Sequence, residues 1–296
     1  MLSIQLQAVL YGNDRESTDA ALSAMANAVR VYQKAAGEIA FRFVYGDASP
    51  KPLMTEEDVN AIRRRVGDCM TFDYRFFGFN SGTSRGLNLL AEGSEADYFI
   101  TMNPDIVVAP RFLSVMLAPF KDPQVGLTEA RQTPMEHHKA YDPVTFTTEW
   151  ATGACIMTRR EAFRQVGGFD AENFFLYCDD VDFSWRLRLA GWKLIYQPLA
   201  PVFHAKKLSN DSKWLPSEAE VYYSALASLL IACKWSNMDR VAYLMPIFQH
   251  RGGAYAKAVE AFRQRQEAGT LPDSLDPTHQ IAHFVEDYYS ENRFVL

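Results

Sequence analysis

The chain has 296 residues, of which 48% are hydrophobic and 22% charged, a composition typical of a folded globular protein. Its 30 Lys and Arg residues against 36 Asp and Glu residues give a formal net charge of -6, which argues against a nucleic-acid partner. This length predicts one large domain, or one domain with an extension, that folds around its own hydrophobic core.

The cysteines and the length of the apolar stretches indicate the cellular compartment of the protein. The four cysteines are widely separated and form no Cys-x-x-Cys pair, which favours reduced thiols over a zinc site or a disulfide framework: Cys69, Cys155, Cys178 and Cys233. Residues 1–7 alternate like a strand and lack the basic start and apolar run of a signal peptide. The longest apolar stretch, 225–233, is far below the ~20 residues of a spanning helix. We therefore expect a cytoplasmic protein.

The first half of the chain alternates strand-like and helix-like segments. Strands are predicted at 4–11, 39–45, 70–72 and 98–102, and helices at 17–36, 55–65 and 84–91. Thr55 and Asp58 resemble a capping box at the start of the second helix. This alternation predicts an α/β fold with a mostly parallel open sheet and helices on both faces.

The second half is less regular and ends in helices. Strands are predicted at 154–158, 193–196 and 202–204, and helices at 160–166, 179–190, 217–234, 254–267 and 280–289. We therefore predict an α/β domain over 1–215 and a C-terminal helical subdomain over 216–296.

Carboxylates stand at three points where strands or turns end: Asp47, Asp105 and the run 179–182. Asp105 follows a strand and Pro104 at the edge where open α/β sheets bind ligands. One such carboxylate is enough to hold Mg²⁺ or Mn²⁺, because these ions complete their shell with water and substrate phosphates. A single Asp in such a position is more often a turn residue. His204, at the end of a later strand, is either a further ligand or a hydrogen-bonded structural residue.

The acidic run allows two interpretations. At helical spacing Asp179 and Asp182 share a face while Asp180 points elsewhere, so the three carboxylates need not have one task. Alternatively, all three complement the positive end of the helix dipole. Aromatic residues flank the run, and they either stack on sugar rings or belong to the core: Phe174, Phe175, Tyr177, Phe183 and Trp185.

A series of short motifs follows in a fixed order over about residues 2–235. They are Gly46-Asp47-Ala48-Ser49, Phe79-Asn80-Ser81-Gly82, Gly86-Leu87-Asn88, Asn103-Pro104-Asp105, Trp150-Ala151-Thr152-Gly153-Ala154, Arg159-Arg160-Glu161-Ala162-Phe163, Val166-Gly167-Gly168-Phe169-Asp170, Phe174-Phe175-Leu176-Tyr177, Asp179-Asp180-Val181-Asp182, Arg186, Ala190-Gly191-Trp192 and Pro201-Val202-Phe203-His204. In this order the chain resembles the rhamnosyltransferase-like members of glycosyltransferase family 2, which have the GT-A fold.

The resemblance implies a role for each matching residue. It divides the α/β domain into a nucleotide-sugar half, about 1–105, and an acceptor half, about 106–215. The donor site would comprise Asp47 on the nucleobase, Asn80, Asn103 and Asp105. Lys206 or Lys207 either helps to offset the charge of the departing diphosphate at this site or is merely solvated, as paired lysines usually are. Asp105 and His204 would hold Mg²⁺ or Mn²⁺, and Asp180 would be the general base. The acceptor site would be formed by Trp150, Thr152, Gly153 and Asp179.

Four features depart from the family pattern. Asn103 replaces the first acid of its Asp-x-Asp motif, Asp179 stands in place of Glu in its Glu-Asp pair, and Ala48 follows Asp47 in place of Asn. The stretch after His204, residues 205–209, lacks the commoner glycine. The first change lowers the charge of the expected metal site.

The activity that the resemblance implies is inverting transfer of a sugar to a saccharide or lipid-linked saccharide in bacterial surface polysaccharide synthesis. The first candidate donor is dTDP-rhamnose, followed by UDP-hexoses and UDP-N-acetylhexosamines. Segment 230–265 holds six Lys or Arg against two Asp or Glu, and is either a peripheral contact with the inner face of the plasma membrane or an ordinary helical surface.

Two other classes remain open from the sequence. A nucleotidyltransferase should carry a Gly-rich, basic loop after its first strand, and residues 12–15 match that pattern weakly. A non-catalytic carbohydrate-binding relative would tolerate loss of the base, whereas Asp180 and Asp105 are both present.

Overall fold

The computed structural model describes residues 1–135, 140–204, 216–285 and 289. The strands of this part are β1 (Ser3–Leu10), β2 (Ala40–Asp47), β3 (Thr71–Phe76), β4 (Tyr98–Met102), β5 (Ile106–Val108), β6 (Val125–Thr133), β7 (Cys155–Arg159) and β8 (Lys193–His204). The helices are α1 (Arg15–Ala36), α2 (Glu56–Val66), α3 (Gly82–Ala91), α4 (Phe112–Leu117), α5 (Arg160–Gln165), α6 (Asp179–Leu189), α7 (Glu218–Lys234), α8 (Met238–Arg251) and α9 (Gly253–Glu267), with a short 3₁₀ helix, η1 (Ala118–Lys121), after α4.

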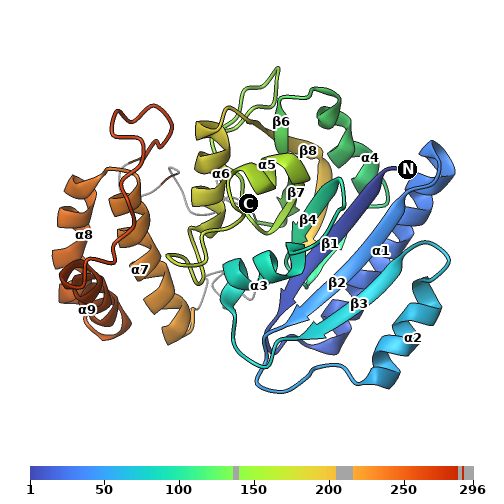
Figure 1. Cartoon of the computed structure of the whole chain (residues 1–296), viewed down its shortest axis with the longest axis horizontal. Helices are drawn as coiled ribbons and strands as arrows, with labels where there is room; N and C mark the ends of the chain where they lie inside the picture. The colour runs from blue at the N-terminus through green and yellow to red at the C-terminus, as the bar shows by residue number, and fades with distance from the viewer. Residues whose placement is uncertain (136–139, 205–215, 286–288, 290–296) are drawn as a thin grey trace.

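The described strands form one sheet in the order β3-β2-β1-β4-β7-β6-β8-β5 (Figure 1). Neighbours among β3, β2, β1 and β4 are parallel, as are β6 and β8. β7 runs antiparallel to β4 and β6, and β5 antiparallel to β8. The predicted α/β fold is confirmed, with its parallel part concentrated in the first half. Because β1, β2 and β4 are parallel, their carboxyl ends meet at one edge.

Helices cover both faces of the sheet. Apolar residues of α1, α2 and α4, such as Met25, Val59 and Leu113, share one core with the β1 residues that face them. Residues of α3, α5 and α6, such as Leu87 and Phe163, form a second core on the other face. In Figure 1 the second set lies in front of the sheet. The N-cap side chain of Asp14 starts α1, and the predicted capping box of Thr55 and Asp58 is present at α2.

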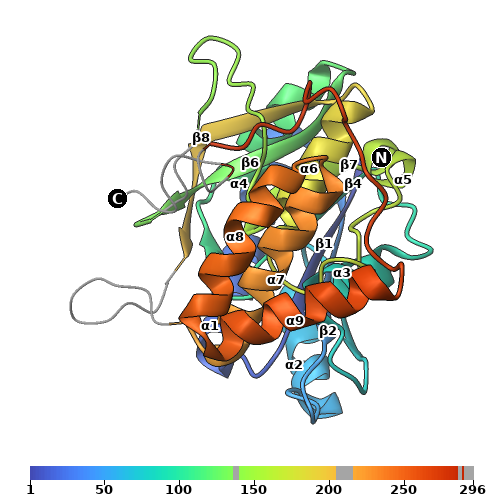
Figure 2. The same ribbon diagram turned by 90° about the vertical axis from the view of Figure 1, so that its left-hand side faces the viewer.

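The helices α7, α8 and α9 pack together beside α6, as Figures 1 and 2 show from two directions. Their core includes the fully buried Trp235 and Phe262, and it also contains Trp185 and Val181 from α6. The helical unit therefore shares one hydrophobic core with the helix that begins at the acidic run.

Most of the apolar surface of segment 230–265 is turned into this core. Trp235, Phe248 and Phe262 are buried, whereas Tyr243 is exposed. Two of the six basic residues, Lys234 and Arg240, are buried as well. Within the described part of the chain, no helix has the length and apolar character needed to span a bilayer.

Three sequence predictions need correction. The strands predicted at 193–196 and 202–204 are one strand, β8, with an irregular pairing to β6 near its middle. Helix α8 was missed; it contains Pro246, whose ring lies on the exposed side of the helix, where the unpaired carbonyl can meet water. Residues 281–285 are not helical, and the Asp276 carboxylate accepts hydrogen bonds from three consecutive N–H groups, those of residues 280–282.

Candidate active site

The start of β7 joins the two acidic segments of the predicted site. The N–H of Asn103 donates to the carbonyl of Ala154 over 2.8 Å. The N–H of the preceding residue, Gly153, donates to Oδ2 of Asp180 over 2.8 Å. The segment that carries Asp105 and the first turn of α6 therefore contact adjacent residues of one strand end, although they are 75 positions apart in the sequence.

Asp105 faces His204 across the ends of β4 and β8. Nε2 of His204 lies 3.8 Å from Oδ1 of Asp105 and 3.4 Å from Nδ2 of Asn103. Nδ1 of His204 lies 2.9 Å from Oε1 of Gln132, a buried side chain of β6. An amide oxygen only accepts hydrogen bonds, so this contact places the ring proton on Nδ1 and leaves the Nε2 lone pair on the side of Asp105.

This arrangement fits a divalent cation with few protein ligands. A metal-bound histidine usually donates its second ring N–H to a carbonyl or carboxylate, as His204 does to Gln132. Among the described residues, no group of three or more His, Cys, Asp or Glu side chains is placed to hold a metal. Mg²⁺ and Mn²⁺ complete their shell with water and phosphate oxygens, so Asp105 and His204 suit a metal that arrives with a diphosphate.

The carboxylate of Asp180 is held at the beginning of α6. Its Oδ2 accepts from Gly153 and its Oδ1 from the N–H of Val181 over 2.8 Å. The side chain stays half-buried, so it is reachable from outside. On the other side of the same strand end, the N–H of Thr152 donates to Oε1 of Glu129 over 2.9 Å. Consecutive backbone N–H groups thus hold two carboxylates in place.

Asp179 lies next to Asp180 in a different environment. It is buried, and Oγ of Ser84 in α3 donates to its Oδ2 over 3.2 Å. Burial, together with the negative charge of Asp180, raises the pKa of Asp179 to about 7. Below neutral pH the Asp179 carboxyl therefore keeps its proton.

The third acid, Asp182, has other partners. Its side chain is fully buried and lies 2.7 Å from both Nε of Arg186 and Nζ of Lys234. The three acids of the run therefore have different partners, although all three lie in the first turn of α6. Through its ion pair with Lys234, Asp182 also binds the first turn of α6 to α7.

Asp47 is fully buried at the end of β2. Its Oδ1 accepts from the N–H of Ser49 over 2.9 Å, its Oδ2 accepts from the N–H of Leu53 over 2.8 Å, and the hydroxyl of Tyr74 also donates to Oδ2. Burial and this contact raise the pKa of Tyr74 to about 12, so the hydroxyl keeps its proton. In this structure Asp47 shapes the turn after β2, and its contact with a nucleobase stays a prediction.

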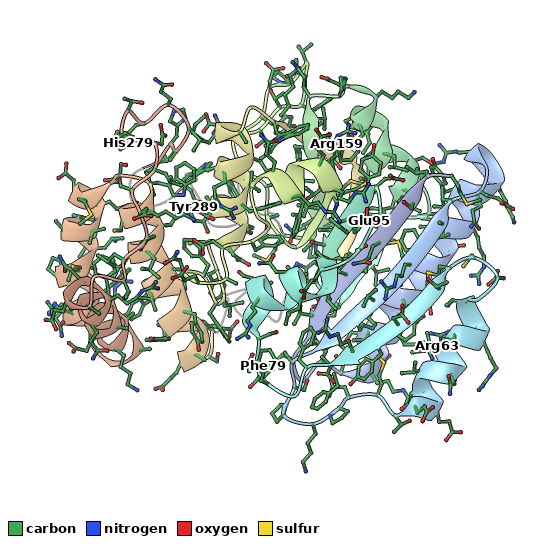
Figure 3. All side chains as sticks on the ribbon, in the orientation of Figure 1. Arg63, Phe79, Glu95, Arg159, His279 and Tyr289 are labelled. Carbon is green, nitrogen blue, oxygen red and sulfur yellow. The ribbon has the colours of Figure 1, made fainter. Side chains whose placement is uncertain are left out.

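The remaining predicted site residues are placed as follows. Asn80 is exposed, and its Oδ1 accepts from the N–H of Gly82 over 3.2 Å at the start of α3. The ring of Trp150 is buried and packs edge-on against Tyr289, with ring centroids 4.9 Å apart. Figure 3 shows Tyr289 between the helical unit and α6, and Phe79 near the carboxyl ends of the strands. Lys206 and Lys207 lie outside the described residues.

The aromatic residues beside the acidic run are mostly core residues. Phe174, Phe183 and Trp185 are almost fully buried. Phe175 is half-buried and stacks on Tyr223 of α7, with ring centroids 4.5 Å apart. The core alternative is therefore confirmed for three of the five, and Phe175 contacts protein rather than open solvent.

Three site residues were missed from the sequence: Glu129, Gln132 and Ser84. Glu129 and Gln132 are buried polar residues in the strand 125–133, where an isolated acid or amide within an apolar segment was a usable signal. Ser84 gave no comparable signal, because a serine near a helix start is ordinary.

The pKa of Asp179 predicts how stability depends on pH. Because the folded-state pKa is raised above the ordinary value for Asp, the folded protein binds more protons than the unfolded chain, and stability falls as pH rises from about 4 to about 7. Asp179→Asn removes this dependence. Its free energy of unfolding relative to the wild type should therefore rise between pH 5 and pH 8, on the order of 2 kcal/mol in urea unfolding.

Glu260→Gln, an exposed change on α9, is the matched control and should show the same difference at both pH values. If Asp179→Asn behaves like this control, Asp179 is ionised in the folded protein throughout the range.

Comparisons of the sequence with known proteins point to sugar transfer. No family model matches the chain. It is 40% identical over 98 residues to an N-acetylglucosaminyl-diphospho-decaprenol L-rhamnosyltransferase of Mycobacterium tuberculosis, a match covering 33% of this chain and 30% of that protein. It is 42% identical over 57 residues to the rhamnosyltransferase WbbL of Escherichia coli, 19% of this chain and 20% of that protein. The chain thus spans less than a third of the length of either relative.

Comparisons of the structure show the fold. GalNAc-T7 with UDP, GalNAc and Mn²⁺ superposes with a TM-score of 0.65 over 95% of this chain and 57% of that protein, at 16% identity. Mannosyltransferase PcManGT from Pyrobaculum calidifontis, in complex with GDP-Man and Mn²⁺, gives a TM-score of 0.55 over 93% of this chain and 77% of that protein, at 15% identity. The sequence relatives are rhamnosyltransferases and the fold is that of GT-A glycosyltransferases, which supports the resemblance to the rhamnosyltransferase-like group of glycosyltransferase family 2.

Proposed function

We propose that the chain is an inverting glycosyltransferase that moves a sugar from a nucleoside diphosphate to a hydroxyl group of a saccharide or lipid-linked saccharide. The observation that carries the proposal is the meeting of two acidic segments at the start of β7. There the N–H of Asn103 donates to the carbonyl of Ala154, and the N–H of Gly153 donates to the carboxylate of Asp180. The segment 103–105, which would bind the phosphate side of the donor, and Asp180, which would act as base, thus contact adjacent residues, as a single displacement requires.

Asp180 is the proposed general base. As the acceptor oxygen attacks the anomeric carbon, Asp180 takes the hydroxyl proton, and the bond from that carbon to the nucleoside diphosphate breaks on the opposite face. A single attack of this kind inverts the configuration. The N–H groups of Gly153 and Val181 orient the carboxylate. The usual contribution of such proton transfer is about 10²–10⁴-fold.

Asp105 and His204 are the proposed ligands of Mg²⁺ or Mn²⁺. When bound, the cation would offset the charge that grows on the departing diphosphate. Gln132 fixes the His204 ring for this purpose, and Asn103 lies within 3.4 Å of the same ring. Support comes from the structural neighbours that were solved with Mn²⁺ and a nucleotide or nucleotide sugar.

For the donor we propose dTDP-rhamnose first, since two of the sequence relatives are rhamnosyltransferases, and UDP-hexoses or UDP-N-acetylhexosamines second. The acceptor is proposed to be a lipid-linked saccharide, as the name of the mycobacterial relative indicates for that protein. In segment 230–265 the exposed Tyr243, Arg251, Lys257 and Arg263 are the proposed membrane contact on the cytoplasmic side.

Asp180→Asn tests the base. The amide keeps the shape of the side chain but cannot accept the proton, so turnover of the nucleotide sugar should fall about 10²–10⁴-fold. Calorimetric binding of dTDP or UDP with Mn²⁺ should be retained. Wild-type turnover in this variant would remove Asp180 from the role of base.

Asp105→Ala tests the metal site. Loss of the carboxylate should weaken binding of dTDP or UDP in the presence of Mn²⁺ by about 10-fold or more, and binding without Mn²⁺ should change little. Asp122→Ala, at a half-buried acid paired with Lys193, is the matched control and should bind normally. An equal loss with and without Mn²⁺ would mean that Asp105 does not act through a metal.

Gly153→Ala tests the close approach of β7 to the base. A methyl group at residue 153 would lie 3.1 Å from Cβ of Asp180, closer than the ~3.5–4.0 Å of ordinary carbon contacts. The carboxylate should therefore shift by a fraction of an ångström, and kcat should fall about 10-fold with nucleotide binding unchanged. An unchanged kcat would show that the base tolerates this displacement.

A further inference from the structure

The segment 170–182, which leads into the proposed base, is held by α7 at several separate points. Near the C-terminus of α7, Nζ of Lys234 lies 2.6 Å from Oδ2 of Asp170 and 2.7 Å from Oδ1 of Asp182. Nε1 of Trp235 also donates to Oδ1 of Asp182, over 3.1 Å. Lys234 is buried and Asp182 is fully buried, so these charges stabilise one another in place of water.

The N-terminal half of α7 holds the same segment through two other residues. The hydroxyl of Tyr177 donates to Oε1 of Glu220 over 3.2 Å. Glu220 is itself fixed, because its other carboxylate oxygen accepts from the N–H of Ser217 in the capping box of α7. The ring of Phe175 stacks on Tyr223. Residues 220, 223 and 234 thus hold the segment along nearly the whole length of the helix.

The backbone between these contacts is strained. Tyr177 and Cys178 have φ angles of 70° and 55°, in the left-handed region that residues other than glycine rarely adopt. They immediately precede Asp179 and Asp180, and the carbonyl of Cys178 accepts from the N–H of Asp182. Strained conformations of this kind persist where surrounding contacts determine them, and here those contacts come in large part from α7.

We propose that α7 is a positioning element for the general base, with Lys234 and the Tyr177–Glu220 hydrogen bond as its two points of action. This rests on the proposed function, because it assigns the residues that place Asp180. Lys234 holds Asp182, two positions after the base on α6, and Tyr177 holds the strained turn three positions before it. The helical unit is therefore part of the catalytic centre, through α6, and not a separate appendage.

Two variants test the proposal. Lys234→Met with Asp170→Asn removes the ammonium together with one of its two carboxylates, and Asp182 keeps its pairing with Arg186. Tyr177→Phe removes the hydroxyl that binds Glu220. The matched control is Tyr32→Phe, a half-buried tyrosine of α1. Each protein is compared by turnover of the nucleotide sugar that the wild type hydrolyses, by binding of dTDP or UDP with Mn²⁺, and by hydrogen–deuterium exchange of peptides over 175–183.

We expect the double variant to lose about 10-fold in kcat and Tyr177→Phe several-fold, with the nucleotide Kd within about twofold of wild type. Exchange over 175–183 should be faster in both variants and unchanged in Tyr32→Phe. Exchange as slow as in the wild type would overturn the proposal. Equal losses of kcat and of nucleotide affinity would overturn it too, because they would indicate a general loss of structure.

Asp180→Asn, measured beside these variants, separates this proposal from the proposed function. If Asp180→Asn keeps its turnover, the base assignment fails, while exchange still reports whether α7 holds the turn. If Asp180→Asn is inactive but the double variant has wild-type kcat, the base stands and the positioning role of α7 is wrong.

Discussion

The hydrogen bond from the Gly153 N–H to Asp180 is the interaction on which the geometry of the site depends. It joins the first turn of α6 to the residues just before β7. The next of these residues, Ala154, accepts a hydrogen bond from the N–H of Asn103. A side chain at 153 would press on Asp180, because its Cβ would lie 3.1 Å from Cβ of Asp180. Since backbone groups in a sheet move little relative to one another, both acidic segments are held by a rigid part of the fold.

Buried charges surround this contact, and their cost explains why they occur as a connected set. An unpaired carboxylate inside a protein is strongly unfavourable, whereas Asp182 is met by Arg186, Lys234 and Trp235. Apolar residues could fill the same volume at least as favourably for stability. The charged residues instead determine geometry, because each hydrogen bond between α6 and α7 fixes the position of one atom relative to another.

Much of the fold could be predicted from local sequence, and much of the site could not. Many strand and helix positions followed from periodicity, and the capping box of Thr55 from two residues, whereas β5, β6, α4 and α8 were not predicted. The contacts of the site join residues far apart in the chain, such as Ser84 with Asp179, so no local pattern indicates them. The helix expected at 280–289 is absent from residues 281–285, and there the prediction missed a local contact, that of the Asp276 carboxylate with the N–H groups of residues 280–282.

The first turn of α6 shows how three similar side chains come to differ. Asp179 faces Ser84 of α3, Asp180 faces the start of β7, and Asp182 faces Lys234 of α7. Burial beside a like charge raises the pKa of Asp179, whereas the half-buried Asp180 is oriented by backbone donors and Asp182 is compensated by cations. In the proposed reaction this separation matters, because a base must be ionised and a neighbouring carboxyl that keeps its proton adds no competing negative charge. The three side chains are chemically identical. They differ in the folded protein because each faces a different element: α3, the start of β7 or α7.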